Sequence, residues 1–156
     1  MINIKIISIL TLSLILTSCG FKKLNQKDGD VIYIQNISVV GDQRIANTLK
    51  NDIRIISNSG AQNKYNIELK VQKNKTIKIK NKSGKITRYN LTIIADLQLI
   101  DVGGEKKLQK TFARSGNYQI AKSHSDTINN ENKTTKNIVQ QLSSDIISYI
   151  IMVARN

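Results

Sequence analysis

Apolar and polar residues alternate along the middle of the chain, which is the pattern of strands that bury one face. The clearest alternation runs from Tyr89 to Leu99, and a second covers Tyr65 to Val71 and resumes over 76–80. An earlier run of β-branched residues, 31–40, predicts a first strand that Gly41 ends. Turn-forming residues between these runs predict that the later strands pair as antiparallel hairpins.

The strand that follows 101–105 has two possible orientations. The segment 101–105 is a turn, so the chain should double back as an antiparallel partner of the preceding strand. The large apolar residues of this strand share a face with Lys110 and Arg114, whereas the opposite face carries small, uncharged side chains. The pattern therefore leaves open which face packs inward. The first face holds Leu108, Phe112 and Tyr118, and the second holds Thr111, Ala113 and Ser115.

Two segments repeat apolar residues every three or four positions, the spacing of a helix with one buried stripe. The first follows Asp42, whose carboxylate suits the N-cap, and the second follows Ser125 or Asp126 and leads to the end of the chain. Their stripes are Ile45, Leu49, Ile53 and Ile56, and Val139, Leu142, Ile146, Ile150 and Val153. The order β-α-β-β-β-α predicts an α+β fold, a four-stranded sheet with two helices packed on one face.

The first residues have the pattern of a bacterial lipoprotein signal peptide. Lys5 precedes the apolar run 6–16, which as a helix would reach only ~16 Å, about half of a bilayer core. Leu-Thr-Ser-Cys-Gly at 16–20 matches a lipobox, with the small Ser18 before Cys19. We expect cleavage before Cys19 and acylation of its thiol and its new amine. Several acyl chains anchor a protein firmly, whereas one chain binds a membrane only marginally.

These features divide the chain into a signal peptide, 1–18, a lipidated tether, 19–30, and a single domain, 31–156. Gly20 rather than an aspartate after Cys19 predicts transport to the outer membrane, where the domain would face the periplasm. The alternatives are a plain secretory signal or an uncleaved anchor. Under either alternative, the unpaired Cys19 would have no evident role in an oxidising compartment. A lipoprotein is therefore the preferred interpretation.

The composition removes several classes of function. Cys19 is the only cysteine and His124 the only histidine, so the chain lacks the ingredients of a disulfide, a thiolate cage or a histidine-rich metal site. We expect His124 to be a solvated residue beside a helix start. The acids Glu68, Asp96 and Glu105 show no catalytic motif. The sequence therefore predicts no enzyme, no metal and no cofactor.

A formal charge of +13 favours polyanionic partners. Nucleic acid is not the expected partner, because the protein is expected outside the cytoplasm and only 4% of its residues are aromatic side chains on which bases could stack. Lysines crowd one predicted hairpin, and they either contact an anion or form a solvated edge enriched by codon bias. This cluster consists of Lys73, Lys75, Lys78, Lys80, Lys82 and Lys85. The candidates for contact with lipopolysaccharide or another anion are Lys78, Lys80, Lys85, Arg88 and Arg114.

Several segments resemble the lipopolysaccharide-assembly lipoprotein family, which is also called LptE or rare lipoprotein B. They are Cys-Gly-Phe at 19–21, the run 87–91 leading into 100–101, and the segment 114–118. The order of elements and the polar segment 121–131 before the closing helix are also similar. The resemblance covers the whole mature chain. The chain departs from the family in having no proline and an unusually lysine-rich hairpin, so lipid contacts are not transferred residue by residue.

The resemblance implies a non-enzymatic assembly factor. Members of the family plug the lumen of a large outer-membrane β-barrel, the LptD-like translocon that delivers lipopolysaccharide to the cell surface, and they bind lipopolysaccharide. The implied partners are this barrel, lipopolysaccharide and the membrane that receives the acyl chains. The alternative is a free-standing outer-membrane lipoprotein that acts as an envelope adaptor, sensor or inhibitor.

Overall fold

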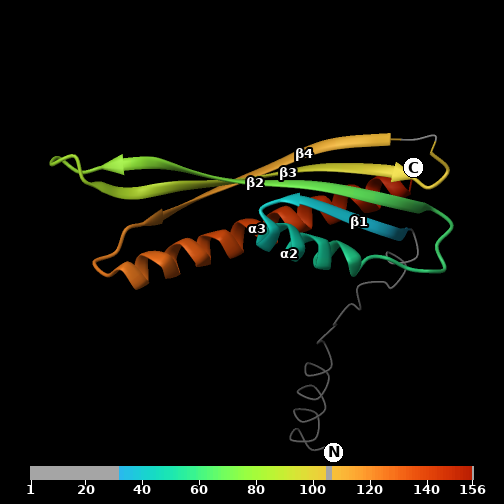
Figure 1. Ribbon diagram of the computed structural model, residues 1–156, viewed down its shortest axis with the longest axis horizontal. Coiled ribbons are helices and arrows are strands. Elements are labelled where there is room, and N and C mark those ends of the chain that lie inside the picture. Colours follow the sequence, from blue (N-terminus) through green and yellow to red (C-terminus); the bar gives the residue numbers. More distant parts are fainter. Residues whose placement is uncertain (1–31, 105–106, 156) are drawn as a thin grey trace, which may run out of the picture.

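The computed structural model describes residues 32–104 and 107–155, and these residues form a long sheet with two helices. The elements are β1 (Tyr33–Gly41), α2 (Gln43–Arg54), β2 (Lys64–Lys80), β3 (Ile86–Asp101), β4 (Lys107–Gln119) and α3 (His124–Ala154). Both helices lie on the same face of the sheet (Figure 1). The predicted fold class and element order are confirmed. Neither of the described helices is long and apolar enough to cross a bilayer.

The four strands lie side by side in the order in which they occur in the chain. β1 is parallel to β2 because α2 carries the chain back across the sheet, and the other neighbours are antiparallel. The register places Leu69 opposite Leu97 and Ile67 opposite both Ile37 and Leu99. A slip of one residue would turn these side chains to solvent, so their burial fixes the register.

The core lies between the helix-covered face of the sheet and the two helices. The alternating residues of β3 from Leu91 to Leu99 are at most 1% exposed, as the alternation predicts. They pack with the apolar stripes of α2 and α3, in which Leu49, Leu142 and Ile146 are fully buried. Neither of the described helices covers the opposite face of the sheet, the helix-free face, which consists largely of polar side chains.

β4 adopts the first of its two predicted orientations. Tyr118 is buried, and Leu108 and Phe112 pack against the core. The alternative, in which Thr111, Ala113 and Ser115 pack inward, is wrong, since all three are exposed. Because β4 is an edge strand, the charged residues on its inward face reach past the core to α3. Arg114 pairs with Asp145, and the Nζ of Lys110 lies 4.5 Å from the ring centroid of Tyr149.

The helices differ in how well their starts were predicted. Oδ1 of Asp42 accepts a hydrogen bond from the amide of Ile45 at 3.1 Å, which confirms this N-cap. The predicted caps Ser125 and Asp126 are wrong, because α3 begins earlier, after Ser123. The Oγ of Ser123 accepts from the amide of Asp126 at 3.0 Å and donates to its carboxylate at 2.7 Å. This N-cap places Asp126 in the first turn of α3. His124, the first helical residue, is exposed as expected.

β2 and β3 continue beyond their neighbours as a projecting hairpin (Figure 1). β1 ends opposite Val71 and β4 ends opposite Arg88, so the last residues of β2 pair only with β3. The turn at the tip is well defined. Oδ1 of Asn81 accepts hydrogen bonds from the amides of Ser83 and Lys85 at 3.1 and 2.9 Å.

Substituting Gly41 by alanine should strongly destabilise the domain. Gly41 has a φ of +102°, and an added Cβ would lie 2.0 Å from the carbonyl oxygen of Val71. We expect the free energy of unfolding to fall by about 3 kcal/mol or more in urea titrations. Gly84→Ala is the matched control, since Gly84 has a φ of +78° but no neighbouring atom within 4 Å, and should cost about 1 kcal/mol. Equal losses in the two variants would contradict the steric argument.

Candidate anion-binding site on the β2–β3 hairpin

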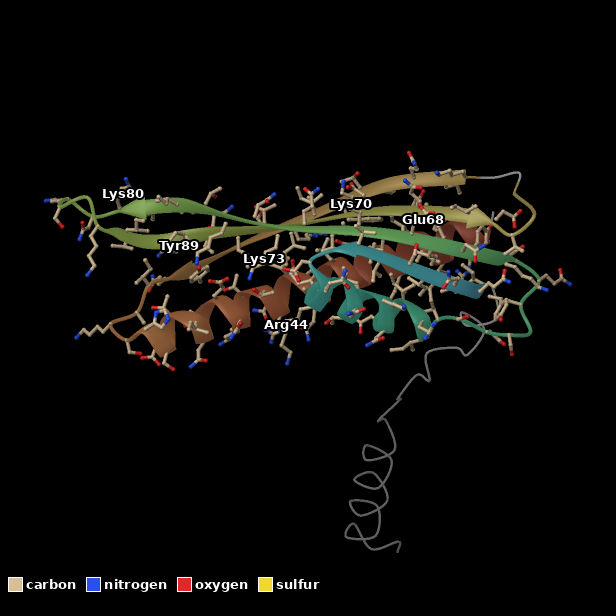
Figure 2. The ribbon with its side chains drawn as sticks, in the orientation of Figure 1. Arg44, Glu68, Lys70, Lys73, Lys80 and Tyr89 are labelled. Atoms are coloured by element: carbon tan, nitrogen blue, oxygen red, sulfur yellow. The ribbon has the colours of Figure 1, made fainter. Side chains whose placement is uncertain are left out.

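The tip of the hairpin carries four exposed lysines, Lys78, Lys80, Lys82 and Lys85. None of them forms an ion pair with another described residue. Figure 2 shows Lys80 near the end of the hairpin, remote from Glu68 on β2. Exposed isoleucines, Ile77 and Ile79, lie among these cations, with 51% and 42% of their surface accessible. Repulsion between the lysines is screened by water and would be relieved by a bound anion.

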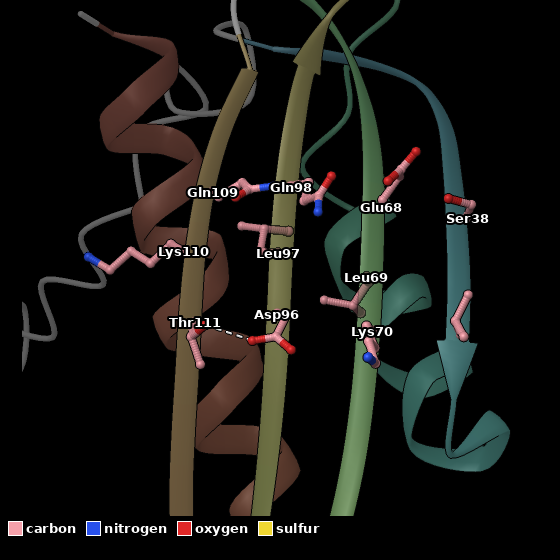
Figure 3. Close-up of a pocket in the computed structure, with 11 residues that line it drawn as sticks. Ser38, Glu68, Leu69, Lys70, Asp96, Leu97, Gln98, Gln109, Lys110 and Thr111 are labelled. Carbon is pink, nitrogen blue, oxygen red and sulfur yellow. Dashed lines mark hydrogen bonds between the residues drawn. The ribbon is translucent and has the colours of Figure 1, made fainter.

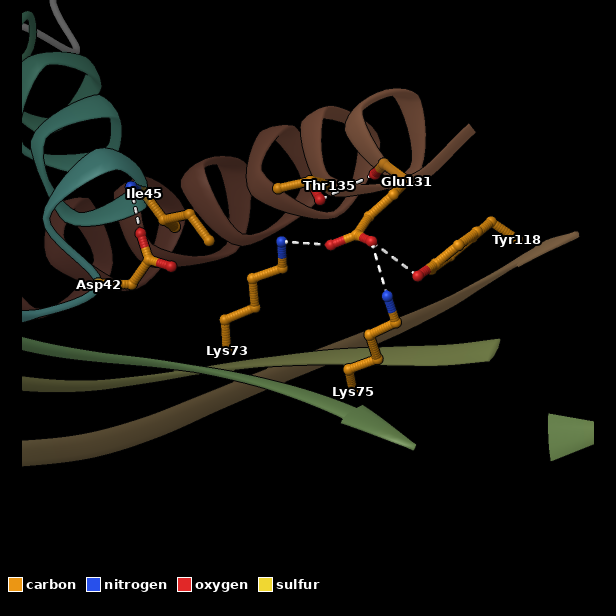
Figure 4. Close-up of polar contacts among 7 residues, drawn as sticks. All are labelled: Asp42, Ile45, Lys73, Lys75, Tyr118, Glu131 and Thr135. Atoms are coloured by element: carbon orange, nitrogen blue, oxygen red, sulfur yellow. Dashed lines mark hydrogen bonds and ion pairs between the residues drawn. The ribbon is translucent and has the colours of Figure 1, made fainter. Parts of the chain in front are cut away.

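The two lysines nearer the base of the hairpin have a different environment. The Nζ atoms of Lys73 and Lys75 lie 2.8 and 3.0 Å from the two carboxylate oxygens of Glu131 in α3. The hydroxyl of Tyr118 donates to the same carboxylate at 2.7 Å (Figure 4). Lys75 also lies over the ring of Tyr89, 4.4 Å from its centroid. We call Lys73, Lys75, Tyr118 and Glu131 the Glu131 cluster.

The Glu131 cluster has a defined protonation state. The hydrogen bond from Lys73 is the main reason that the pKa of Glu131 falls to about 2. Burial raises the pKa of Tyr118, and the hydrogen bond with Tyr118 raises the pKa of Lys75. At neutral pH the carboxylate is therefore charged and accepts three donors. Lys73 and Lys75, which the sequence grouped with the tip lysines, instead connect the hairpin to α3.

The structure separates the two candidate arginines. Arg88 lies near the tip of the hairpin, partly buried, opposite Ile79 of β2 and Gln119 of β4. Arg114 is in β4 and lies opposite Ile93 of β3. Ile93 is five residues from Arg88 along β3, so the two arginines are ~16 Å apart in the direction of the strands. Its guanidinium contacts both carboxylate oxygens of Asp145, at 2.7 and 3.0 Å. This hydrogen bonding lowers the pKa of Asp145 and directs Arg114 towards α3.

A second surface of interest is the helix-free face of the sheet, which has a shallow hollow of about 690 Å³. Glu68 and Lys70 of β2 and Asp96 of β3 line it (Figure 3). Asp96 accepts a hydrogen bond from Thr111 at 2.6 Å, and Oε1 of Gln98 is buried without a partner. Within 32–104 and 107–155, no group of three potential metal ligands lies close enough together to hold an ion.

Cys19, the predicted lipid attachment site, lies outside the described residues, as does Glu105. The signal peptide, the tether and the acylation of Cys19 therefore stay predictions. The anion contacts of Lys78, Lys80, Lys85, Arg88 and Arg114 stay predictions as well. The structure adds their positions and the pairing of Arg114, but no bound anion tests their roles.

Solved lipoprotein structures share this fold. Rare lipoprotein B of Shewanella oneidensis is 11% identical and superposes with a TM-score of 0.59 over 76% of this chain and 95% of its own. A minor lipoprotein of Acinetobacter baumannii is 15% identical, with a TM-score of 0.57 over 75% of this chain and 90% of its own. No protein-family model and no curated protein matches the sequence. The likeness confirms the predicted resemblance to rare lipoprotein B at the level of the fold.

The Glu131 cluster should make stability depend on pH. Because the pKa of Glu131 is about 2 in the folded protein and about 4.5 ordinarily, its contribution is complete above pH 4.5 and disappears as the pH falls through 2. Glu131→Gln should therefore lower the free energy of unfolding by about 1 kcal/mol at pH 7, with little difference near pH 2. Urea titrations across this range measure it.

Glu68→Gln is the matched control for this prediction. Glu68 is exposed on the helix-free face and forms no ion pair with another described residue. Its substitution should change stability by less than about 0.5 kcal/mol at either pH. A constant difference between Glu131→Gln and the parent protein from pH 7 to pH 2 would show that the carboxylate charge is not the cause.

Proposed function

We propose that this protein is a non-enzymatic outer-membrane lipoprotein that assembles with and plugs a large β-barrel lipopolysaccharide translocon. In this proposal Cys19 carries the acyl chains and the domain faces the periplasm and the barrel lumen. The observation that carries the proposal is a projecting hairpin whose tip lysines form no ion pair with a described residue, on a fold shared with rare lipoprotein B. The lipobox at 16–20 supports the same assignment.

The proposed mechanism begins with the anchor. Acyl chains on Cys19 confine the domain to the membrane surface and raise its effective concentration near the barrel. The domain then occupies the lumen through broad contacts rather than through chemistry. Its helix-free sheet face suits such a contact, because amide and hydroxyl side chains outnumber the charged residues Glu68, Lys70 and Asp96 there, and a partner can pair them at a lower desolvation cost than charges.

Lipopolysaccharide binding is assigned to the tip of the hairpin. Lysines act as mobile point charges for phosphate groups, and Arg88 offers a planar guanidinium that can bind phosphate with two hydrogen bonds. The Glu131 cluster supports this role, because it attaches the base of the hairpin to α3 while the tip lysines stay unpaired. The asparagine-centred turn fixes the backbone that carries Lys82 and Lys85.

Affinity purification tests the assembly. The tagged full-length protein, extracted from membranes in mild detergent, should bring down one large outer-membrane barrel in stoichiometric amount, identified by mass spectrometry. Cys19→Ser should reduce the membrane-bound fraction, because the acylated thiol is lost. Recovery of the protein from membranes without a barrel would instead favour the free-standing adaptor, sensor or inhibitor.

Charge reversal tests the lipid contact. Lys78→Glu/Lys80→Glu/Arg88→Glu should weaken lipopolysaccharide binding at low salt by roughly tenfold or more, and added salt should reduce the difference. The control Arg54→Glu/Lys64→Glu/Lys107→Glu changes the charge equally at exposed positions away from the hairpin. Unchanged binding in the hairpin variant, or equal loss in both, would contradict the assignment.

A further inference from the structure

A second group of cations lies apart from the hairpin tip, in a groove between α2 and α3. The groove has a volume of about 590 Å³, within the range of small-molecule sites in proteins. Its walls include Ile45 and Val139, which belong to the buried core. The groove is therefore built mainly on the packed body of the domain, and Lys73 at the base of the hairpin is its one lining residue from β2.

Four basic side chains from three elements line this groove. Arg44 comes from α2, Lys73 from β2, and Lys133 and Lys136 from α3. Figure 4 shows Lys73 extending from β2 into the space between the start of α2 and α3. Lys133 and Lys136 are three residues apart, so their like charges lie on one side of α3 and repel each other. Such convergence concentrates positive potential in one concave place.

The acidic residues of the groove balance only part of this positive charge. Asp42 and Asp52 are the two acids in its lining, and Asp42 caps α2 through the amide of Ile45. The side chains of Arg44, Lys133 and Lys136 form no ion pair with any described residue. Lys73 alone has an acidic partner, Glu131. An anion in the groove would therefore meet three cations without an ion-pair partner and a fourth that is shared with Glu131, against two aspartates, so the lining is net positive.

We propose that the groove binds a phosphorylated sugar or cyclitol, either free or as a lipid headgroup. Arg44 supplies the planar donor set that suits a phosphate, and Lys133 and Lys136 supply point charges from the opposite wall. Asn132 and Gln140 also line the groove, and their amide groups suit ring hydroxyls. The site is distinct from the hairpin tip, and the proposal does not depend on assembly with a barrel.

Titration calorimetry with the full-length protein in neutral detergent micelles tests the groove. One arm adds glucose 1,6-bisphosphate, and the other uses micelles that contain phosphatidylinositol 4-phosphate. Binding in the first arm assigns a free ligand, and binding in the second alone assigns a headgroup. Arg44→Gln/Lys136→Gln should weaken the observed binding by roughly tenfold. Neither substitution should unfold the protein, since both side chains are exposed and Arg44 lies in the first turn of α2.

Two control variants locate the effect. Lys64→Gln/Lys107→Gln removes the same charge from exposed positions outside the groove, and Lys80→Gln/Lys82→Gln removes it from the hairpin tip. Both should keep the parent affinity within about twofold. Absence of binding in both arms, or equal losses in the groove and control variants, would overturn the proposal. Loss of lipopolysaccharide binding in the hairpin variants alone bears on the proposed function and leaves the groove unaffected.

Discussion

The burial of one face of β3 under the two helices is the constraint on which the rest of the molecule depends. Five alternating residues from Leu91 to Leu99 lie within the core and set the register of both neighbouring strands. Because α2 and α3 cover the same face, the other face of the sheet is left to polar side chains. The cations named above lie on the helix surfaces, the edge strand β4 and the hairpin, with Lys70 on the helix-free face, and water can solvate them in each of these places.

Among the basic side chains of the domain, the fold separates those that stabilise the structure from those that are available to a partner. Lys73 and Lys75 join the hairpin to α3 through Glu131, and Arg114 joins β4 to α3 through Asp145. The lysines of the hairpin tip have no acidic partner among the described residues. The paired residues hold elements in place. The unpaired residues, joined in the α2–α3 groove by Lys73, form the two candidate anion sites, one at the hairpin tip and one in that groove.

Much of the fold was predictable because its elements are locally consistent. The alternation of β3, the stripe of α2 and its cap Asp42 each depend on a few neighbouring residues. The sequence pattern predicts a later start for α3 than the structure shows, because the first turns of this helix are polar and are held by Ser123 and by contact with the hairpin base. The sequence predicts the candidate site only as a cluster of lysines. It does not show which of them are paired, because Glu131, the acidic partner of Lys73 and Lys75, is more than fifty residues away in the chain.

The sequence by itself determined the class of fold, the order of its elements and the presence of a strongly basic hairpin, since periodicity and charge are local properties of the chain. Only the tertiary structure decided which face of β4 packs inward, which lysines are paired and that Arg114 turns to Asp145. It also brought Arg44, Lys73 and Lys136 into one groove. These outcomes follow from how α3 packs across the sheet, and no short stretch of sequence encodes a contact between distant segments.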